Sequence, residues 1–200
     1  MKAELQRQSQ QSIMFKTIAQ CISRSPNPES VLSVVVAETR RLLKVDRVLA
    51  YRFNPDRSGV VCAESVSSQC QALFGQTIKD PCFAHQFDQL YRIGHIQIVE
   101  DLEDGNLPAC YIDLLKQFQV KAIVVVPILL QGSLWGFLIA HHCTSPRHWQ
   151  VWEVELIEHL AAQLSITIQQ AEFYQHVQQF SNELEHYMQN CSNEICRYFL

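Results

Sequence analysis

The sequence predicts an α+β domain with a central antiparallel sheet, flanked by helices and followed by a long C-terminal helix. Two pairs of apolar segments are each joined by a short turn, which is typical of β-hairpins. Apolar residues at helical spacing precede the first pair, and a short helical stretch precedes the second. One long helical stretch then runs towards the C-terminus.

Composition excludes several classes of function. The 200 residues are 48% apolar and 18% charged, so the chain can bury a sizeable core. A net charge of -4 without any run of Lys or Arg argues against nucleic-acid binding. The start lacks the apolar region of a signal peptide, and the longest apolar run, residues 122–130, is too short to span a membrane. We therefore expect a cytoplasmic protein.

The chain divides into three parts in this interpretation. Residues 1–25 form a Gln-rich N-terminal helix, residues 26–170 the main domain, and residues 171–200 a helical extension. The main domain opens with a helix, for which Asn27 is the expected cap and Pro28 the first residue. The extension carries apolar residues at alternating steps of four and three, which favours a partner helix.

Four strands are expected between the first and last helices of the main domain. Residues 47–53 and 60–66 form one hairpin; residues 122–129 and 134–142 form the other. A mixed region from Ser67 to Leu107 shows little periodicity, and its length favours a functional insertion. A short helix over residues 108–118 follows it, and Pro146 is expected to open the long last helix.

Two of the eight cysteines stand out because each follows a proline at the predicted start of a helix. Cys82 and Cys110 would lie in a first turn, where the helix dipole favours the nucleophilic thiolate. Asp80 would cap the first of these helices or accept a hydrogen bond from a ligand. Without an export signal or a CxxC pair, neither a disulfide framework nor a zinc site is expected.

The sequence contains few of the motifs that enzymes of these classes require. A Cys–His hydrolase would need a base from the four candidate histidines, but no cysteine-protease signature surrounds either thiol. The six glycines are scattered and form no phosphate-binding loop. We therefore expect no enzyme activity beyond assistance to the chain's own modification. The candidate histidines are His85, His95, His141 and His142.

Two cysteine motifs and a strand motif together resemble the cyanobacteriochromes, the bilin-binding GAF domains related to phytochromes. Asp80-Pro81-Cys82-Phe83 is similar to the Asp-Xaa-Cys-Phe motif of the dual-cysteine type. The segment that begins with Cys110-Tyr111 resembles the chromophore-attachment helix, and residues 134–141 resemble a closing strand. The resemblance covers roughly residues 13–174 and implies a GAF fold for the main domain.

The resemblance implies a photochromic sensory domain. Cys110 would carry a linear tetrapyrrole through a permanent thioether, and Cys82 would add reversibly to it. Formation of the second thioether gives a blue-absorbing state. Light isomerises the bilin, and cleavage of this thioether then gives an orange- or green-absorbing state. Asp80 would accept hydrogen bonds from pyrrole nitrogens, and His141 would contact the chromophore near rings C and D.

Further assignments concern the residues that bind the propionates and those that form the walls of the site. Arg92 and His95 are the candidates for the two propionates of a bilin. Aromatic walls are expected from Phe83, Tyr111 and Trp149. Many members have His where this chain has Tyr111, and that His is associated with conversion of phycocyanobilin into phycoviolobilin. The resemblance therefore implies that phycocyanobilin is retained, with phycoviolobilin as the alternative.

Two other functions stay open at this point. A GAF domain that binds a cyclic nucleotide or another small ligand without a covalent bond would have the same fold. A thiol redox sensor would need Cys82 and Cys110 within disulfide range. In the photoreceptor reading, the partners are the bilin, a second copy of the chain through the terminal helices, and an output domain outside these 200 residues.

Overall fold

One six-stranded antiparallel sheet, in the order β3-β2-β1-β6-β5-β4, organises the computed structural model. Residues 27–80, 87–104 and 107–198 are described, so the expected helix over residues 1–25, Cys82 and Phe83 lie outside them. The elements are α2 (Pro28–Leu43), β1 (Arg47–Phe53), β2 (Gly59–Val66), β3 (Thr77–Ile78), α3 (Phe87–Arg92), β4 (Gln97–Val99), α4 (Ala109–Gln117), β5 (Ala122–Leu130), β6 (Ser133–His142) and α5 (Val151–Tyr198).

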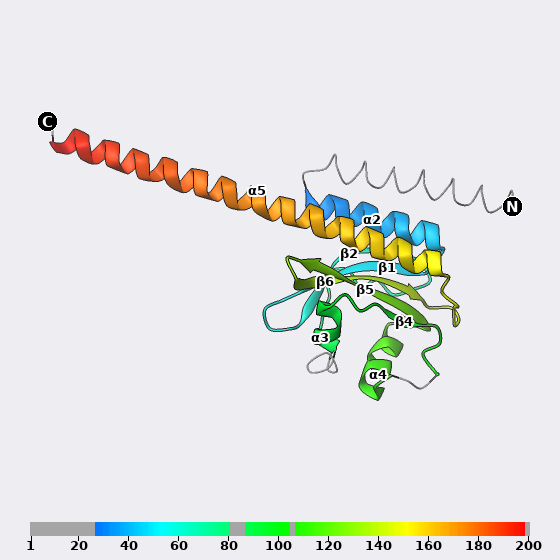
Figure 1. Ribbon diagram of the computed structural model, residues 1–200. Helices are drawn as coiled ribbons and strands as arrows, with labels where there is room; N and C mark the ends of the chain where they lie inside the picture. Colours follow the sequence, from blue (N-terminus) through cyan, green and yellow to red (C-terminus); the bar gives the residue numbers. More distant parts are fainter. Residues whose placement is uncertain (1–26, 81–86, 105–106, 199–200) are drawn as a thin grey trace, which may run out of the picture.

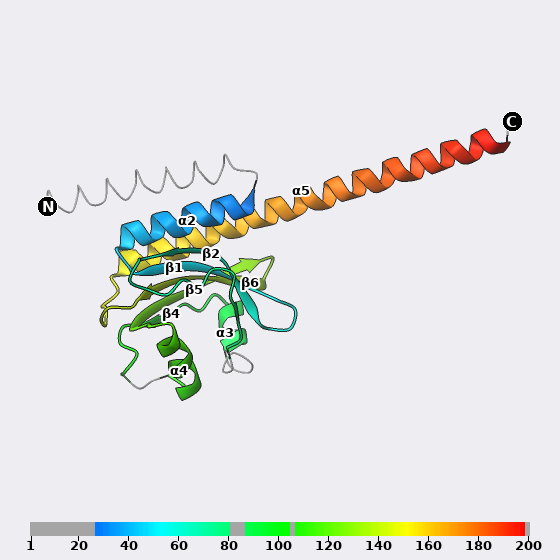
Figure 2. The ribbon, with the colours of Figure 1, turned by 180° about the vertical axis from the view of Figure 1, so that it is seen from behind.

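The sheet separates two layers of helices. Figures 1 and 2 show α2 and α5 side by side on one face, with α3 and α4 on the other. Alternate strand residues point to opposite faces, as the pleat requires. Val124 and Ala140 belong to the core beneath α2 and α5, whereas their neighbours Ile123 and Val125 belong to the core beneath α3 and α4. The α+β class and the antiparallel sheet are therefore confirmed.

The predicted start of the first helix of the main domain is also confirmed. Asn27 has an extended backbone, and its side-chain oxygen accepts a hydrogen bond of 2.9 Å from the amide of Glu29. Pro28 follows at the first helical position, where its missing N–H costs nothing. Both predicted hairpins form, and α4 lies where the short helix was expected.

The sequence prediction missed two strands inside the Ser67–Leu107 region. β3 and β4 have two and three residues, respectively. They form the two edges of the sheet, so each pairs with one neighbouring strand. Segments this short carry too few residues to show a period of two. The insertion is therefore part of the sheet, with α3 between its two edge strands.

The predicted start of the last helix is wrong. α5 begins at Val151 rather than at Pro146, because the preceding segment is tied to other elements. The Arg147 side chain donates 2.7 Å to the carbonyl of Leu43 and 2.6 Å to Glu153. The other Glu153 oxygen accepts a 3.0 Å hydrogen bond from the amide of Gln150. Gln150 therefore takes the capping position in place of Ser145.

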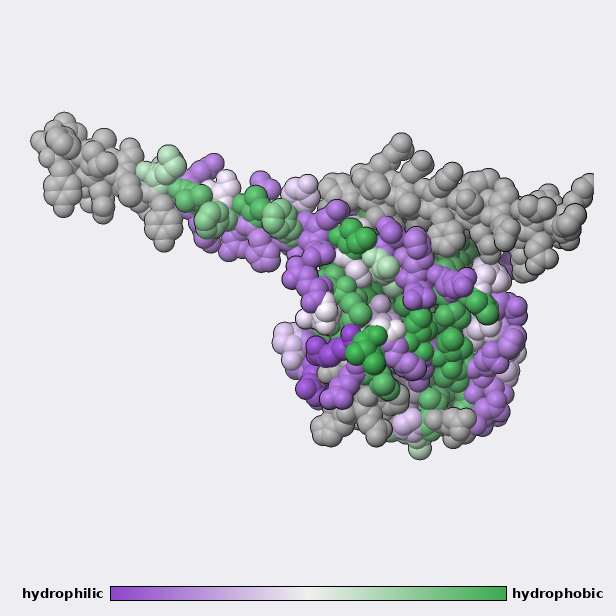
Figure 3. All heavy atoms as spheres, viewed as in Figure 1, coloured by the Kyte–Doolittle hydropathy of each residue, from purple (hydrophilic) through white to green (hydrophobic). Residues whose placement is uncertain are grey.

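α5 is buried only along its first part. Its side chains pack into the core as far as Ile168, and beyond it the helix projects away from the sheet (Figures 1 and 3). The projecting part exposes a row of large apolar residues, among them Phe173, Val177, Phe180 and Leu184. Among the described helices, none is both long and apolar enough to cross a membrane.

Candidate ligand pocket

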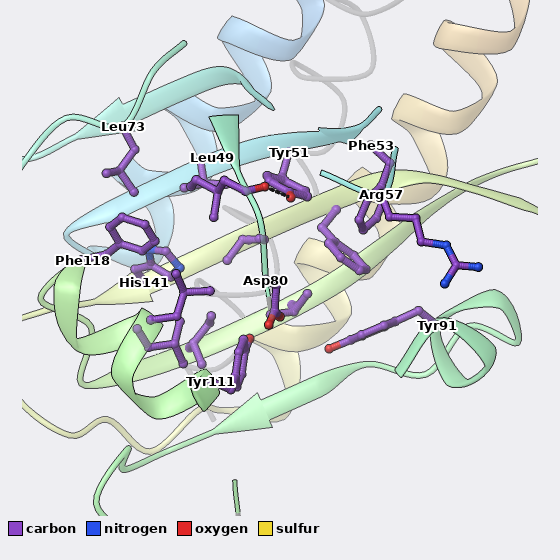
Figure 4. Close-up of a pocket in the computed structure, with 17 residues that line it drawn as sticks. Leu49, Tyr51, Phe53, Arg57, Leu73, Asp80, Tyr91, Tyr111, Phe118 and His141 are labelled. Carbon is purple, nitrogen blue, oxygen red and sulfur yellow. Dashed lines mark hydrogen bonds between the residues drawn. The ribbon is translucent and has the colours of Figure 1, made fainter. Parts of the chain in front are cut away.

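A pocket lies on the sheet face that carries α3 and α4 (Figure 4). It is formed mainly by apolar side chains from β1, β5, β6 and α4, with a few polar groups among them. Its cavity of about 90 Å³ is smaller than the several hundred Å³ of a typical small-molecule site. A large occupant therefore needs the wall to move outwards. The lining residues are Leu49, Tyr51, Phe53, Arg57, Leu73, Ile78, Asp80, Tyr91, Tyr111, Leu114, Leu115, Phe118, Ile123, Val125, Phe137, Ile139 and His141.

α4 is held to the domain by few buried side chains. Leu115 is the one residue of this helix that is fully buried, and Cys110 on its first turn is exposed. Tyr111 and Phe118 add partly buried contacts to the core on this face. Because so few side chains hold it, α4 can shift to widen the pocket at a small cost in lost burial.

Three tyrosine hydroxyls are held by the two short edge strands. Tyr51 donates 2.8 Å to the carbonyl of Ile78 in β3. Tyr91 and Tyr111 donate to the same side-chain oxygen of Gln97 in β4, over 2.6 and 3.3 Å. The strands that the sequence did not reveal therefore position the polar edges of the pocket.

Asp80 is the carboxylate among the lining residues of the pocket. It points towards Tyr111 in Figure 4, and the hydroxyl of Tyr91 faces the same region. Burial raises the pKa of Tyr51 and Tyr91, and the Asp80 charge raises both further. The pKa of Tyr111 is raised by burial, then by Tyr91 and Asp80. All three tyrosines consequently keep their protons at neutral pH and serve as donors.

His141 lies in the pocket, as the sequence analysis expected. It sits near the end of β6, buried, and its Nδ1 lies 3.1 Å from a guanidinium nitrogen of Arg47. Burial lowers the pKa of His141 to about 3, and the positive charge of Arg47 acts in the same direction. The imidazole is therefore neutral at physiological pH.

Cys110 occupies the first turn of α4, as predicted. Tyr111, the next residue in the chain, lines the pocket, so the first turn of α4 borders it. Cys110 is disulfide-bonded in this structure, whereas the thiols of Cys62, Cys70 and Cys143 are free. The sequence did not predict this disulfide, since reduced thiols were expected.

Three other predicted site residues do not line the pocket. Arg92 and His95 are exposed at and just beyond the end of α3, whereas the cation that does line the pocket is Arg57, from the β1–β2 turn. Trp149 packs in the core on the opposite face of the sheet, and its indole N–H donates 3.2 Å to the carbonyl of Val99. It does not wall this pocket.

Sequence reasoning missed several lining residues that a register argument could have found. His141 and Phe137 are an even number of residues apart on β6, and Tyr51 lies opposite Phe137 on β1. Side chains at such positions share a face. Tyr91 and Gln97, in contrast, come from the aperiodic insertion, where no pattern in the sequence signals a pocket.

Known proteins with the same fold were found by sequence and by structure. The GAF domain model matches residues 27–168. A candidate methyl-accepting chemotaxis protein of Synechocystis sp. is 39% identical over 82% of the chain, and the chain spans 16% of that protein's length.

Two solved structures are similar over most of their length. The blue-light absorbing form of the PixJ GAF domain of Thermosynechococcus elongatus is 34% identical, with a TM-score of 0.71 over 80% of this chain and 93% of that one. The phycocyanobilin-bound GAF domain of a cyanobacterial phytochrome is 29% identical, with a TM-score of 0.77 over 83% and 97%. With a family model that covers most of its residues, and with this sheet and these flanking helices, the chain belongs to the GAF domain family.

Proposed function

We propose that the chain is a photochromic sensory domain that binds a linear tetrapyrrole in the pocket beneath α3 and α4. The observation that carries this proposal is a largely apolar pocket bordered by α4, the helix that carries Cys110 on its first turn and contributes Tyr111 to the wall. The similar GAF domain of a cyanobacterial phytochrome is a phycocyanobilin-bound one, which supports a bilin as the ligand.

The addition of a reduced thiol to the bilin needs no oxidant or reductant. The Cys110 thiol adds across the double bond of the ring A side chain: a C–S bond forms and the thiol proton goes to the neighbouring carbon. Cys82, which lies outside the described residues, adds in the same way to the bridge between rings B and C. The proton of the Cys82 thiol goes to a ring nitrogen of the bilin. Elimination reverses the step and restores both the thiol and the free bridge. Each addition requires a reduced thiol, so the disulfide at Cys110 must first be reduced by an external dithiol, which is itself oxidised to a disulfide.

Light then acts on the bridge between rings C and D. The second thioether interrupts conjugation and gives a blue-absorbing state; its loss restores the longer-wavelength state. Similarity to the blue-light absorbing form of the PixJ GAF domain supports a blue-absorbing state. Asp80 accepts hydrogen bonds from the pyrrole nitrogens, and His141 donates one to an oxygen near ring D, since both residues line the pocket.

The two propionates need cations at the mouth of the pocket. Arg57 is the stronger candidate because it lines the pocket, whereas the expected Arg92 and His95 do not. Both lie close to the wall residue Tyr91: Arg92 follows it in α3, and the His95 ring centroid lies 6.4 Å from that of Tyr91. Neither these contacts nor the bilin reaction makes the chain an enzyme in this proposal, apart from its own chromophore attachment. The output enzyme or receptor lies in other domains, as the greater length of the chemotaxis relative suggests.

A dimer through α5 would carry the signal outwards. Apolar residues on the projecting part of α5 step by four and three, which suits a parallel or antiparallel partner helix. A change in the pocket would reach this helix through the sheet, since α5 packs on β5.

Absorption spectra of the phycocyanobilin-loaded protein before and after blue illumination test the proposal. We expect a reversible shift from blue to longer wavelength in the wild type, and no blue-absorbing state in Cys82→Ala. A covalent pigment that does not respond to light would contradict the photochromic function.

A redox role for Cys110 is the second candidate, because its disulfide is present in the structure. In that case the oxidised and reduced proteins would differ in stability or association, and no bilin would attach after reduction. Non-covalent ligand binding, the remaining GAF function, would give a bound ligand that is lost on denaturation.

A further inference from the structure

Arg47 is the most deeply buried cation of the described domain, and three segments around the pocket share it. Its side chain has no exposed surface, and its guanidinium donates to the carbonyls of Phe118 and Gln71 over 3.1 and 2.6 Å. Phe118 is the residue that follows α4, and Gln71 lies in the loop after β2. The guanidinium therefore joins β1 to two segments of the pocket wall.

Glu64 fixes the guanidinium from the other side. Arg47 Nε lies 3.2 Å from a Glu64 oxygen in an ion pair whose angle does not make a hydrogen bond. Both side chains are almost fully buried, at 0% and 2% exposure. Glu64 also accepts hydrogen bonds of 2.8 Å from the amides of Leu73 and Phe74. With its counter-ion immobilised, the guanidinium has no freedom to rotate away.

The remaining contact of this guanidinium is with His141. Arg47 and His141 are register partners on adjacent strands, so their side chains lie on the same face of the sheet. Nη1 of Arg47 lies 3.1 Å from Nδ1 of His141. A guanidinium has donors only, so Nδ1 must be the acceptor and carries no proton. A neutral imidazole holds one N–H, and it is consequently on Nε2.

We propose that Arg47 is a positioning residue that fixes His141 as the neutral tautomer with its proton on Nε2, so that the pocket presents a hydrogen-bond donor to an acceptor oxygen of its ligand. Burial and the Arg47 charge both lower the pKa of His141, which agrees with a neutral ring. The nature of that oxygen, a bilin lactam carbonyl, rests on the proposed function; the tautomer does not.

The tautomer can be observed without any ligand. The full chain, labelled with ¹⁵N at histidine, gives long-range ¹H–¹⁵N correlations that distinguish a protonated from an unprotonated ring nitrogen. His141→Gln identifies the signals of His141 among the eight histidines. We expect one neutral form at pH 7, protonated at Nε2. Protonation at Nδ1, a charged ring, or comparable amounts of two tautomers would overturn the proposal.

Variants at position 47 test whether Arg47 sets this tautomer. The side-chain carbonyl of glutamine can accept a hydrogen bond from an Nδ1–H group, so Arg47→Gln should convert a large part of His141 to the Nδ1–H form. Arg47→Lys keeps a charged donor and should restore the Nε2–H form. Arg52→Gln, an exposed change on the same strand, should alter neither nitrogen signal.

Each outcome of these variants supports or contradicts a positioning role for Arg47. A folded Arg47→Gln protein with His141 still wholly in the Nε2–H form would contradict a positioning role for Arg47. If that variant does not fold, the wild-type tautomer and the result for Arg47→Lys still support or contradict the proposal. Failure of the protein to take up bilin would leave the tautomer result intact, which separates this inference from the proposed function.

Discussion

Gln97 illustrates how single residues shape the pocket. Its side-chain oxygen accepts hydrogen bonds from Tyr91 on α3 and Tyr111 on α4, and the Gln97 side chain is buried on a three-residue strand. One acceptor thus fixes two aromatic walls from two different helices. The protonated state of both tyrosines follows from burial and from the charge of Asp80.

Gln97→Leu tests this shared acceptor. We expect the free energy of unfolding to fall by roughly 1–3 kcal/mol, because two partly or fully buried hydroxyls lose a hydrogen bond. Urea unfolding of the single variant, of Tyr91→Phe and of the double variant measures the coupling. Strictly additive losses would show that Gln97 and Tyr91 do not interact as the structure indicates.

His141 makes a second prediction at this scale, on pH. Its pKa in the folded protein is about 3, below the ordinary value of about 6.5. The unfolded chain therefore binds a proton below pH 6.5 that the folded chain does not. Stability is unaffected by His141 above pH 6.5 and falls as the pH drops towards 3, by up to about 1.4 kcal/mol per pH unit.

Unfolding by urea at pH 7, 6, 5 and 4 measures this slope, with His141→Gln as the control. The variant should lose less stability than the wild type over the same range, because the other acid-sensitive groups are unchanged. Equal slopes would mean that His141 titrates normally in the folded state.

Among the elements, length and pattern decided what the sequence could reveal. The hairpin of β5 and β6 has nine and ten residues, and the capped start of α2 has its Asn-Pro signal, so both were predictable. β3 and β4 were not, because their two and three residues gain their stability from pairing with distant strands. The start of α5 was misplaced since the Ser-Pro signal competes with the tertiary contacts of Arg147.

Some residues of the pocket were predictable from the sequence, and others were not. Helix-start chemistry singled out Cys110, and the family resemblance indicated Asp80 and His141, which the structure places in the pocket wall. Arg57, Tyr91 and Gln97 come from a turn and an aperiodic insertion, where only the folded chain shows which side chains meet. Arg47 looked like an ordinary strand residue, and its role depends on its register with His141.

The projecting part of α5 yields a prediction about association. Phe180 is 63% exposed in this row of apolar residues. Phe180→Glu should weaken a dimer roughly hundredfold, because each of two phenylalanines contributes about 1.5 kcal/mol or more on burial. Sedimentation analysis measures the change, with the exposed Gln178→Glu as a charge-matched control. Association that is the same for wild type and both variants would place any dimer contact elsewhere.

On the scale of the whole molecule, the sheet separates sensing from transmission. The pocket lies under α3 and α4, and α5 packs on the other face before it projects from the domain (Figures 1 and 2). In the proposed photoreceptor, a bilin that changes shape acts on β5 and β6 from one face, and α5 receives the change from the other. Widening of the small cavity by movement of α4 would accompany chromophore uptake.

Covalent uptake of the chromophore is the most direct test of this function. Reduced apoprotein is mixed with phycocyanobilin, denatured, and examined for pigment that stays with the chain, beside Cys110→Ala and with Cys143→Ala as a thiol control. We predict covalent phycocyanobilin, not phycoviolobilin, on the wild type and on Cys143→Ala, and none on Cys110→Ala. A wild-type chain that emerges colourless from denaturation would contradict the bilin photoreceptor and favour a non-covalent ligand or a redox role.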